Sequence, residues 1–178
     1  ARDRCGDPGK PVGDPQVITF DRSEALRYLG YRGTEPDAAV EESLVRCAEG
    51  LQDVIQPQSV FRRFPLRHPA ENMLDVAGVA IHSNHLARNL KDCTDVYLMA
   101  ATLGIGADRL IARASAVRMS DAVIYQAVAA AMIEAYCEEV NDMLRRKAGN
   151  YGLYCRPRFS PGYGDFDIGH QRDLSRLL

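Results

Sequence analysis

Apolar residues recur at helical spacing between positions 36 and 55 and share one helical face: Val40, Leu44, Cys47 and Leu51. Thr34 suits an N-cap, Pro36 suits a first helical turn, and Pro57 lies where a helix must end. The pattern predicts an amphipathic helix over about 36–55 that buries one face.

The longest helical pattern runs from about 120 to 148, with Ser120-Asp121 as its cap, and it has two faces. One face is broad and apolar, and we expect it to pack on the core: Tyr125, Val128, Ala129, Met132, Tyr136, Val140 and Met143. The opposite face carries Glu134 and Glu138 among small residues: Ala127, Ala130, Ala131, Cys137 and Asn141. Two unpaired carboxylates one turn apart repel each other modestly. This face is either a solvated surface or one that leaves room for a ligand.

Three stretches resemble strands. Residues 59–81 predict two strands joined at His68-Pro69, and 17–20 predict a short edge strand. The nearly continuous apolar run over 95–103 is typical of a buried central strand. We therefore expect an α+β fold with an antiparallel or mixed sheet and packed helices.

Turn signals place the shorter helices. Asp21 or Ser23 can cap a brief helix that ends at Gly30, and Ser83 can cap one through Leu90. A final helix is expected from about 169 to 178.

Gly104-Ile105-Gly106 joins the apolar run to a helix beginning near Ala107. A strand, a glycine turn and a helix N-terminus can bind an anion. A dinucleotide site also needs a third glycine and a downstream acid, which are absent here, so we interpret this segment as a tight turn.

Composition narrows the function classes. A chain of 178 residues with a net charge of −2 can bury one substantial core and lacks the basic surplus of a nucleic-acid-binding protein. No apolar run approaches the length of a membrane span. Residues 1–15 are rich in proline, glycine and charge, which predicts a flexible arm before one domain over 16–178.

The cysteines and histidines do not form a metal motif. The five cysteines are widely separated, without a Cys-x-x-Cys pair, as expected for reduced thiols in a cytoplasmic protein. His82 and His85 are three residues apart and could share a helical face, but no third ligand is evident. We expect structural histidines and no metal.

The segment Arg158-Phe159-Ser160-Pro161-Gly162-Tyr163-Gly164-Asp165 holds the strongest candidate chemistry. Pro161 fixes its own φ and Gly162 can adopt a positive φ, so the segment predicts a tight turn. Such a loop brings backbone N–H groups close to a ligand, and an arginine offers a planar fork to a carboxylate. The residues alone also allow an ordinary surface turn.

The run Arg-x-x-Pro-Gly-Tyr resembles the S-adenosylmethionine-binding motif in the activation domain of cobalamin-dependent methionine synthase. The longer form RFSPGYGD is most similar to the free-standing relatives of that domain in anaerobic bacteria. Further segments agree in the expected order over about 17–178: Leu26-Arg27-Tyr28-Leu29-Gly30-Tyr31, Ala101-Thr102-Leu103-Gly104 with Asp108, and Ile133-Glu134.

The resemblance implies a factor that reactivates methionine synthase by supporting reductive methylation of cob(II)alamin. The methyl group comes from S-adenosylmethionine, the electron from a donor such as a flavodoxin or ferredoxin, and the cobalamin from the partner protein. No acid or base is required, so the residues only bind and orient. Two alternatives stay open: a non-catalytic, S-adenosylmethionine-responsive docking partner, and a methyltransferase component for another corrinoid protein.

The resemblance also implies roles for individual residues. Arg158 would bind the methionine carboxylate, while Ser160 and Gly162 would offer backbone contacts. Glu134 would face the positively charged amino or sulfonium group, and Tyr163 would lie toward the corrin or near the cation.

The sequence departs from the family at two places. Members usually continue into a segment with a Ser-Met-Pro pattern that completes the adenosine side, whereas this sequence ends at Leu178. We expect either a longer chain or an open pocket that binds weakly. After Tyr163, fused domains carry proline and a cysteine-proline-histidine run, whereas this chain has Gly164, Asp165 and Phe166. This change affects the expected cobalamin-side contacts more than the Arg158 contact.

Overall fold

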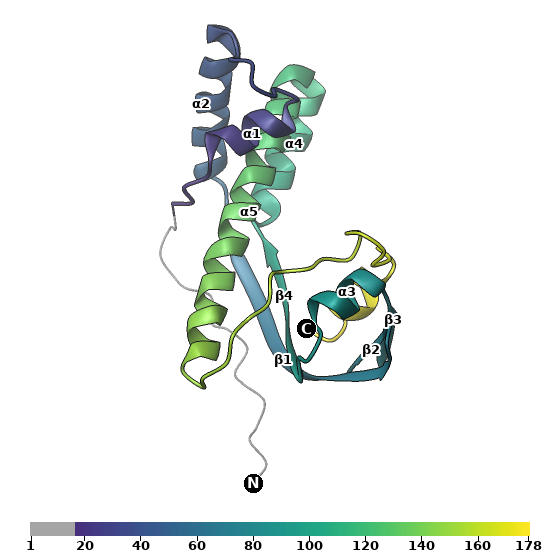
Figure 1. Cartoon of the computed structure of the whole chain (residues 1–178). Helices are drawn as coiled ribbons and strands as arrows, with labels where there is room; N and C mark the ends of the chain where they lie inside the picture. The colour runs from purple at the N-terminus through teal and green to yellow at the C-terminus, as the bar shows by residue number, and fades with distance from the viewer. Residues whose placement is uncertain (1–16) are drawn as a thin grey trace. The chain divides into compact units, whose positions relative to one another are not determined.

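The computed structural model describes residues 17–178, so the expected arm over 1–15 lies outside the described part of the chain. In chain order the elements are α1 (Arg22–Tyr28), α2 (Ala38–Gln52), β1 (Gln58–Ala70), β2 (Met73–Val76), β3 (Val79–His82), α3 (Asn84–Asn89), β4 (Asp95–Thr102), α4 (Ile105–Val117), α5 (Met119–Gly149) and α6 (His170–Ser175) (Figure 1). The four strands form one antiparallel sheet in the order β3-β2-β1-β4. The expected α+β class, with one long helix, is confirmed.

The region over 59–81 forms three strands, not the two that we expected. The expected loop at His68-Pro69 lies inside β1, where the pairing with β2 shifts between Arg67 and Ala70. Proline donates no ladder hydrogen bond, and an irregularity of this kind is one of the few places where a strand tolerates it. The actual turn is Ala77-Gly78, where both residues have positive φ and connect β2 to β3 as a hairpin.

Two expectations about strands were wrong. The run over 95–103 forms β4 at the edge of the sheet, half-buried along most of its length rather than central. Residues 17–20 form no strand, because the Ile18 backbone pairs instead with the side-chain amide of Gln52 at N–O distances of 3.4 and 2.5 Å.

The described residues group into two compact units. The first contains 59–100 and 143–178, and its core combines the sheet with α3 and the C-terminal loop: Leu66, Leu74, Val76, Ile81, Leu86, Ala87 and Phe166. In this unit α3 packs on β2 and α6 packs on β3. A residue at position 166 thus belongs to a core built mainly from positions 64–98.

The second unit contains 17–58 and 101–142 of the described residues, and it is helical. Asp37 caps α2 by accepting a hydrogen bond from the Val40 N–H at 2.9 Å, so the expected cap at Thr34 was wrong. The expected tight turn at Gly104-Ile105-Gly106 is confirmed: Gly104 has a φ of +87°, and a Cβ on Gly106 would lie 2.1 Å from the Val54 carbonyl oxygen.

The apolar face of α5 packs as expected, with Val128, Met132, Tyr136 and Val140 buried. The opposite face, which we expected to be either a solvated surface or one with room for a ligand, is only partly exposed. Ala127, Ala131 and Asn141 are buried, whereas Glu134 and Glu138 are exposed. Three of the small residues are thus buried, Ala130 and Cys137 are half-buried, and the two carboxylates reach the surface.

Candidate ligand-binding loop

The Arg158–Asp165 segment begins with a β-turn over 160–163. The Tyr163 N–H donates to the Ser160 carbonyl at 3.1 Å, and Gly162 has a φ of +92°. Proline in the second position and glycine at positive φ in the third are the signature of a type II turn. The predicted tight turn is confirmed in its residues and its conformation.

A second turn folds the loop back on the first. The Phe166 N–H donates to the Tyr163 carbonyl at 3.1 Å, and the Gly162 N–H donates to the Phe166 carbonyl at 2.7 Å. Gly164 has a φ of +59° and lies against His85, so that a Cβ there would be 2.3 Å from the His85 Nδ1 atom. The two glycines allow a compact double turn next to α3.

Aromatic packing holds the two ends of the double turn. Phe166 is 3% exposed in the core of this unit, and the half-buried Phe159 packs against the same cluster. The Tyr163 ring meets Phe159 edge to face at 5.2 Å between ring centroids, yet Tyr163 remains 69% exposed. The loop is thus held on the core by Phe159 and Phe166, while the outer surface of Tyr163 is open to solvent.

Asp165 connects the loop to the N-terminus of α3. Its Oδ1 accepts from the Ser83 hydroxyl at 2.5 Å and the His85 N–H at 3.1 Å, and its Oδ2 accepts from the Asn84 N–H at 2.8 Å. These hydrogen bonds, foremost that from Ser83, hold the pKa of Asp165 well below its ordinary value. The carboxylate therefore stays ionised and caps the helix.

Ser83, Asp165 and His85 do not form a nucleophilic triad. The Ser83 hydroxyl bonds to the carboxylate directly, whereas a triad needs an imidazole between the two. Ser83 is 4% exposed, and its oxygen also accepts from the Leu86 N–H at 3.0 Å. The cluster is a helix cap. The shared helical face expected for His82 and His85 was wrong, since His82 ends β3 and His85 lies in α3.

The structure brings four of the five predicted site residues together in this loop. Arg158, Ser160, Gly162 and Tyr163 are all exposed and belong to one unit. Asn89 fixes the entry to the loop by donating its side-chain amide to the Pro157 carbonyl at 3.0 Å. Glu134, the fifth, is exposed on α5 in the other unit. Sequence reasoning assigned no role to Asp165, although Ser83 as a helix cap was a usable signal.

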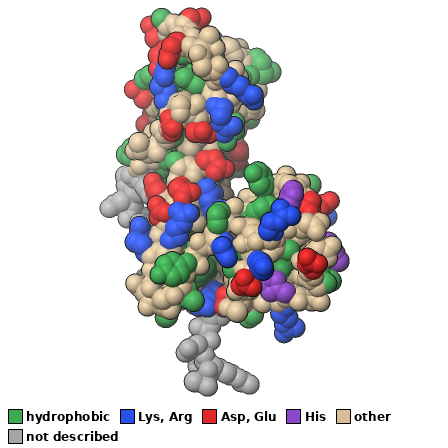
Figure 2. Space-filling model, viewed as in Figure 1, with side chains coloured by type: hydrophobic (Ala, Val, Ile, Leu, Met, Phe, Trp, Pro, Cys, Tyr) green, Lys and Arg blue, Asp and Glu red, His purple; other side chains and the backbone are tan. Residues whose placement is uncertain are grey.

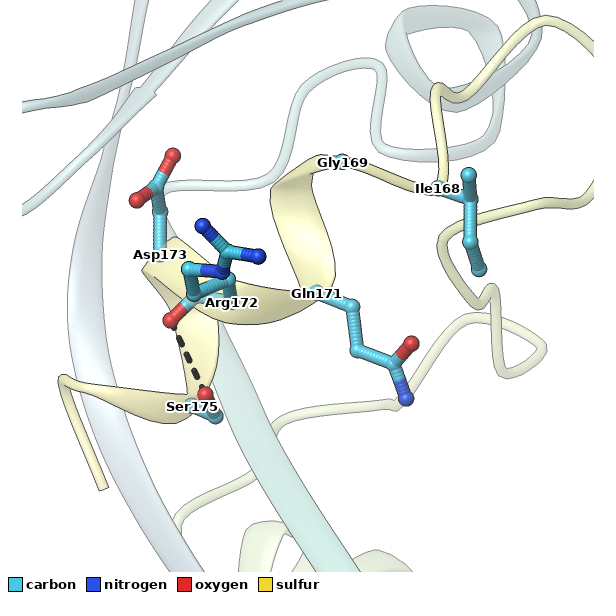
Figure 3. Close-up of a pocket in the computed structure, with 6 residues that line it drawn as sticks. All are labelled: Ile168, Gly169, Gln171, Arg172, Asp173 and Ser175. Atoms are coloured by element: carbon cyan, nitrogen blue, oxygen red, sulfur yellow. Dashed lines mark hydrogen bonds between the residues drawn. The ribbon is translucent and has the colours of Figure 1, made fainter.

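An open hollow of about 630 Å³ lies beside α6 (Figure 3). Its lining comes entirely from one segment: Ile168, Gly169, Gln171, Arg172, Asp173 and Ser175. Figure 3 shows Arg172 and Asp173 on one side of the helix and Gln171 on another, while the Ser175 hydroxyl donates to the Arg172 carbonyl at 2.9 Å. None of the predicted site residues lines this hollow.

Charge and metal-ligand patterns add no competing site among residues 17–178. Figure 2 shows Lys/Arg and Asp/Glu side chains interspersed over the visible face of each unit. Within the described range, no group of three or more His, Cys, Asp or Glu side chains is arranged to hold a metal ion. No helix in that range is both long and apolar enough to cross a membrane.

The antiparallel sheet and the long helix define an α+β protein. Its candidate site is the exposed Arg158–Asp165 loop, which is closed by a double turn. The fold is similar to that of a solved structure, the MetH reactivation domain bound to AdoHcy, with a TM-score of 0.60 at 15% identity. The similarity covers 89% of this chain and 64% of that one. No protein-family model matches the sequence, and no curated protein matches it. The likeness confirms the activation-domain fold that the sequence motifs predicted.

Proposed function

We propose that this chain binds S-adenosylmethionine through the Arg158–Tyr163 loop and supports reductive methylation of the cobalamin of a methionine synthase. One observation supports this proposal above the others. The Arg-x-x-Pro-Gly-Tyr motif forms an exposed double turn in a chain whose fold is similar to that of a reactivation domain bound to AdoHcy.

The loop residues suit the ligand. The exposed Arg158 guanidinium can donate two parallel hydrogen bonds to the carboxylate of the methionine moiety. Glycine at position 162 lets the turn adopt a φ of +92°, and the Ser160 N–H and the Gly162 carbonyl, which the double turn does not use, can offer backbone contacts. The exposed Tyr163 ring, supported edge-on by Phe159, can stack near a sulfonium or a corrin.

In this methyl transfer the protein only has to bind and orient S-adenosylmethionine. When bound, S-adenosylmethionine supplies a methyl group activated by a positively charged sulfur, and the cobalamin belongs to the partner. Arg158 and the turn then hold the carboxylate end in a fixed place, so that the sulfonium end points in a defined direction. Glu134, a separate proposed contact in the other unit, offers an exposed carboxylate to a cation.

A methyl-transfer assay tests this function. The chain is incubated with a cobalamin protein, a reductant such as a reduced flavodoxin or ferredoxin, and S-adenosylmethionine labelled in its methyl group. We expect label on the cobalamin only when all four components are present. Transfer that is equally fast without the chain would contradict the proposal.

The same assay separates the two alternatives. A non-catalytic docking partner that stabilises the reactivation conformation of the corrinoid protein would support labelling even when Arg158→Ala prevents the chain itself from holding S-adenosylmethionine. A methyltransferase component for a different corrinoid protein would move label to that protein and not to methionine synthase.

A further inference from the structure

We propose that Asp165 is the positioning residue of the ligand-binding loop: by capping α3 across 80 residues of sequence it fixes the position of the turn that carries Tyr163. This inference rests on the proposed function for its ligand, but its structural part can be tested without it.

Three donors converge on this one carboxylate, and all come from the start of α3. Ser83 supplies a hydroxyl, while Asn84 and His85 supply backbone N–H groups, at distances of 2.5, 2.8 and 3.1 Å. The Ser83 side chain is itself buried and bonded to the Leu86 N–H. The carboxylate is therefore held by rigid backbone and a fixed hydroxyl, not by mobile surface side chains.

The hydrogen bonds of Asp165 act directly on the turn that carries Tyr163. Asp165 is the third residue of the second turn, between the Tyr163 carbonyl and the Phe166 N–H that bond to each other. Gly164, the preceding residue, leaves no room for a Cβ beside the His85 side chain. Phe159 and Phe166 hold the loop by packing, which tolerates small shifts, whereas three hydrogen bonds fix both distance and direction.

The substitution Asp165→Asn isolates this role. Both carboxylate oxygens accept hydrogen bonds, so an amide must present its NH₂ group to at least one of the three donors. The side-chain volume is unchanged, and the core residues of this unit are not touched. The matched control is Asp167→Asn, two residues further on, because the Asp167 carboxylate accepts from the nearby Gly169 N–H at 2.6 Å and not from α3.

The experiment combines hydrogen exchange with calorimetry against AdoHcy. In Asp165→Asn we expect faster exchange in 160–166, unchanged exchange in β2 and β3, and roughly tenfold weaker AdoHcy binding, the loss of about one charge-assisted hydrogen bond. Asp167→Asn should match the wild type in both measurements.

Wild-type exchange in 160–166 for Asp165→Asn would overturn the inference, and so would faster exchange spread equally over β2 and β3. If the wild-type chain fails to bind AdoHcy, the proposed function is wrong. Local loosening of 160–166 would then still support Asp165 as the residue that fixes the loop.

Discussion

The Ser83 hydroxyl donates a hydrogen bond of 2.5 Å to the Asp165 carboxylate, although the two residues are 82 positions apart. Ser83 caps α3 from within its own strand-to-helix connection, and Asp165 caps it from the C-terminal loop. The helix start therefore has two anchors, and one of them belongs to the candidate ligand-binding loop.

This double cap predicts an acid-dependent stability. The pKa of Asp165 in the folded chain lies below its ordinary value of 3.8, because the carboxylate form accepts the Ser83 hydroxyl and two backbone N–H groups. A group with a lowered folded pKa contributes stability above its unfolded pKa, and that contribution is lost as the pH falls further. The advantage of the wild type over Asp165→Asn should be constant from about pH 7 to 5 and shrink below about pH 4.

Urea unfolding of the two proteins at pH 7, 5, 3.5 and 2.5 measures this difference. The asparagine variant does not titrate at position 165, so the contributions of titratable groups far from this position cancel in the difference. The same pair of proteins with His85→Ala in both removes the imidazole whose Nδ1 atom lies 3.8 Å from the Asp165 Oδ1 atom. A difference in unfolding free energy that stays the same down to pH 2.5 would show that the ionised carboxylate is not the stabilising species.

The contact between Gly164 and His85 predicts that Gly164→Ala is more harmful than an alanine at an open glycine. Both Gly164 and Gly152 have positive φ, at +59° and +70°, but only Gly164 has a neighbour within 4 Å. The left-handed backbone costs an alanine about 1–2 kcal/mol at either position. The steric clash adds to this only at Gly164, and each additional 1 kcal/mol lowers Tm by about 2–4 °C in a chain of this size.

Thermal unfolding of Gly164→Ala and Gly152→Ala gives the comparison, and the His85→Ala background separates the clash from the backbone cost. In that background the two alanine variants should lose similar stability. Equal Tm values for the two variants in the wild-type background would contradict the close packing of Gly164.

The elements that local chemistry determines were predictable from the sequence. The Ser160–Tyr163 turn and the Ser83 cap follow from proline, glycine and serine at fixed offsets, and the structure has both. The apolar face of α5 follows from its 3.6-residue period. In these cases the residues that decide the conformation lie within the turn, cap or helix itself.

The errors arose where a distant residue decides the outcome. Gln52 satisfies the Ile18 backbone and so removes the need for a strand at 17–20, and the pairing of β1 with β2 carries Pro69 inside a strand. The edge position of β4 depends on sheet order, which a hydrophobic run does not encode. Asp165 was missed as a structural anchor because its partners lie 80 to 82 residues earlier.

Glu134 is predicted to matter less for binding than Arg158. It is exposed on α5, and Glu138 lies one turn away, so that a second carboxylate can take over part of the attraction to a cation. Glu134→Ala should therefore weaken S-adenosylmethionine binding by less than tenfold, and the double variant with Glu138→Ala by more than either single one. Calorimetry of the three variants checks this order, and a Glu134→Ala loss as large as that of Arg158→Ala would reverse it.

Binding of S-adenosylmethionine to Arg158→Ala, measured by calorimetry, tests the central claim most directly. A hydrogen bond to a charged group is worth about 1.5–3 kcal/mol, so we predict roughly ten- to a hundredfold weaker binding at an unchanged Tm. The control is Arg156→Ala, two residues earlier and separated by the stiff Pro157, which should bind as the wild type does. A folded Arg158→Ala protein that binds S-adenosylmethionine as tightly as the wild type would show that the Arg158–Tyr163 loop is only a surface turn.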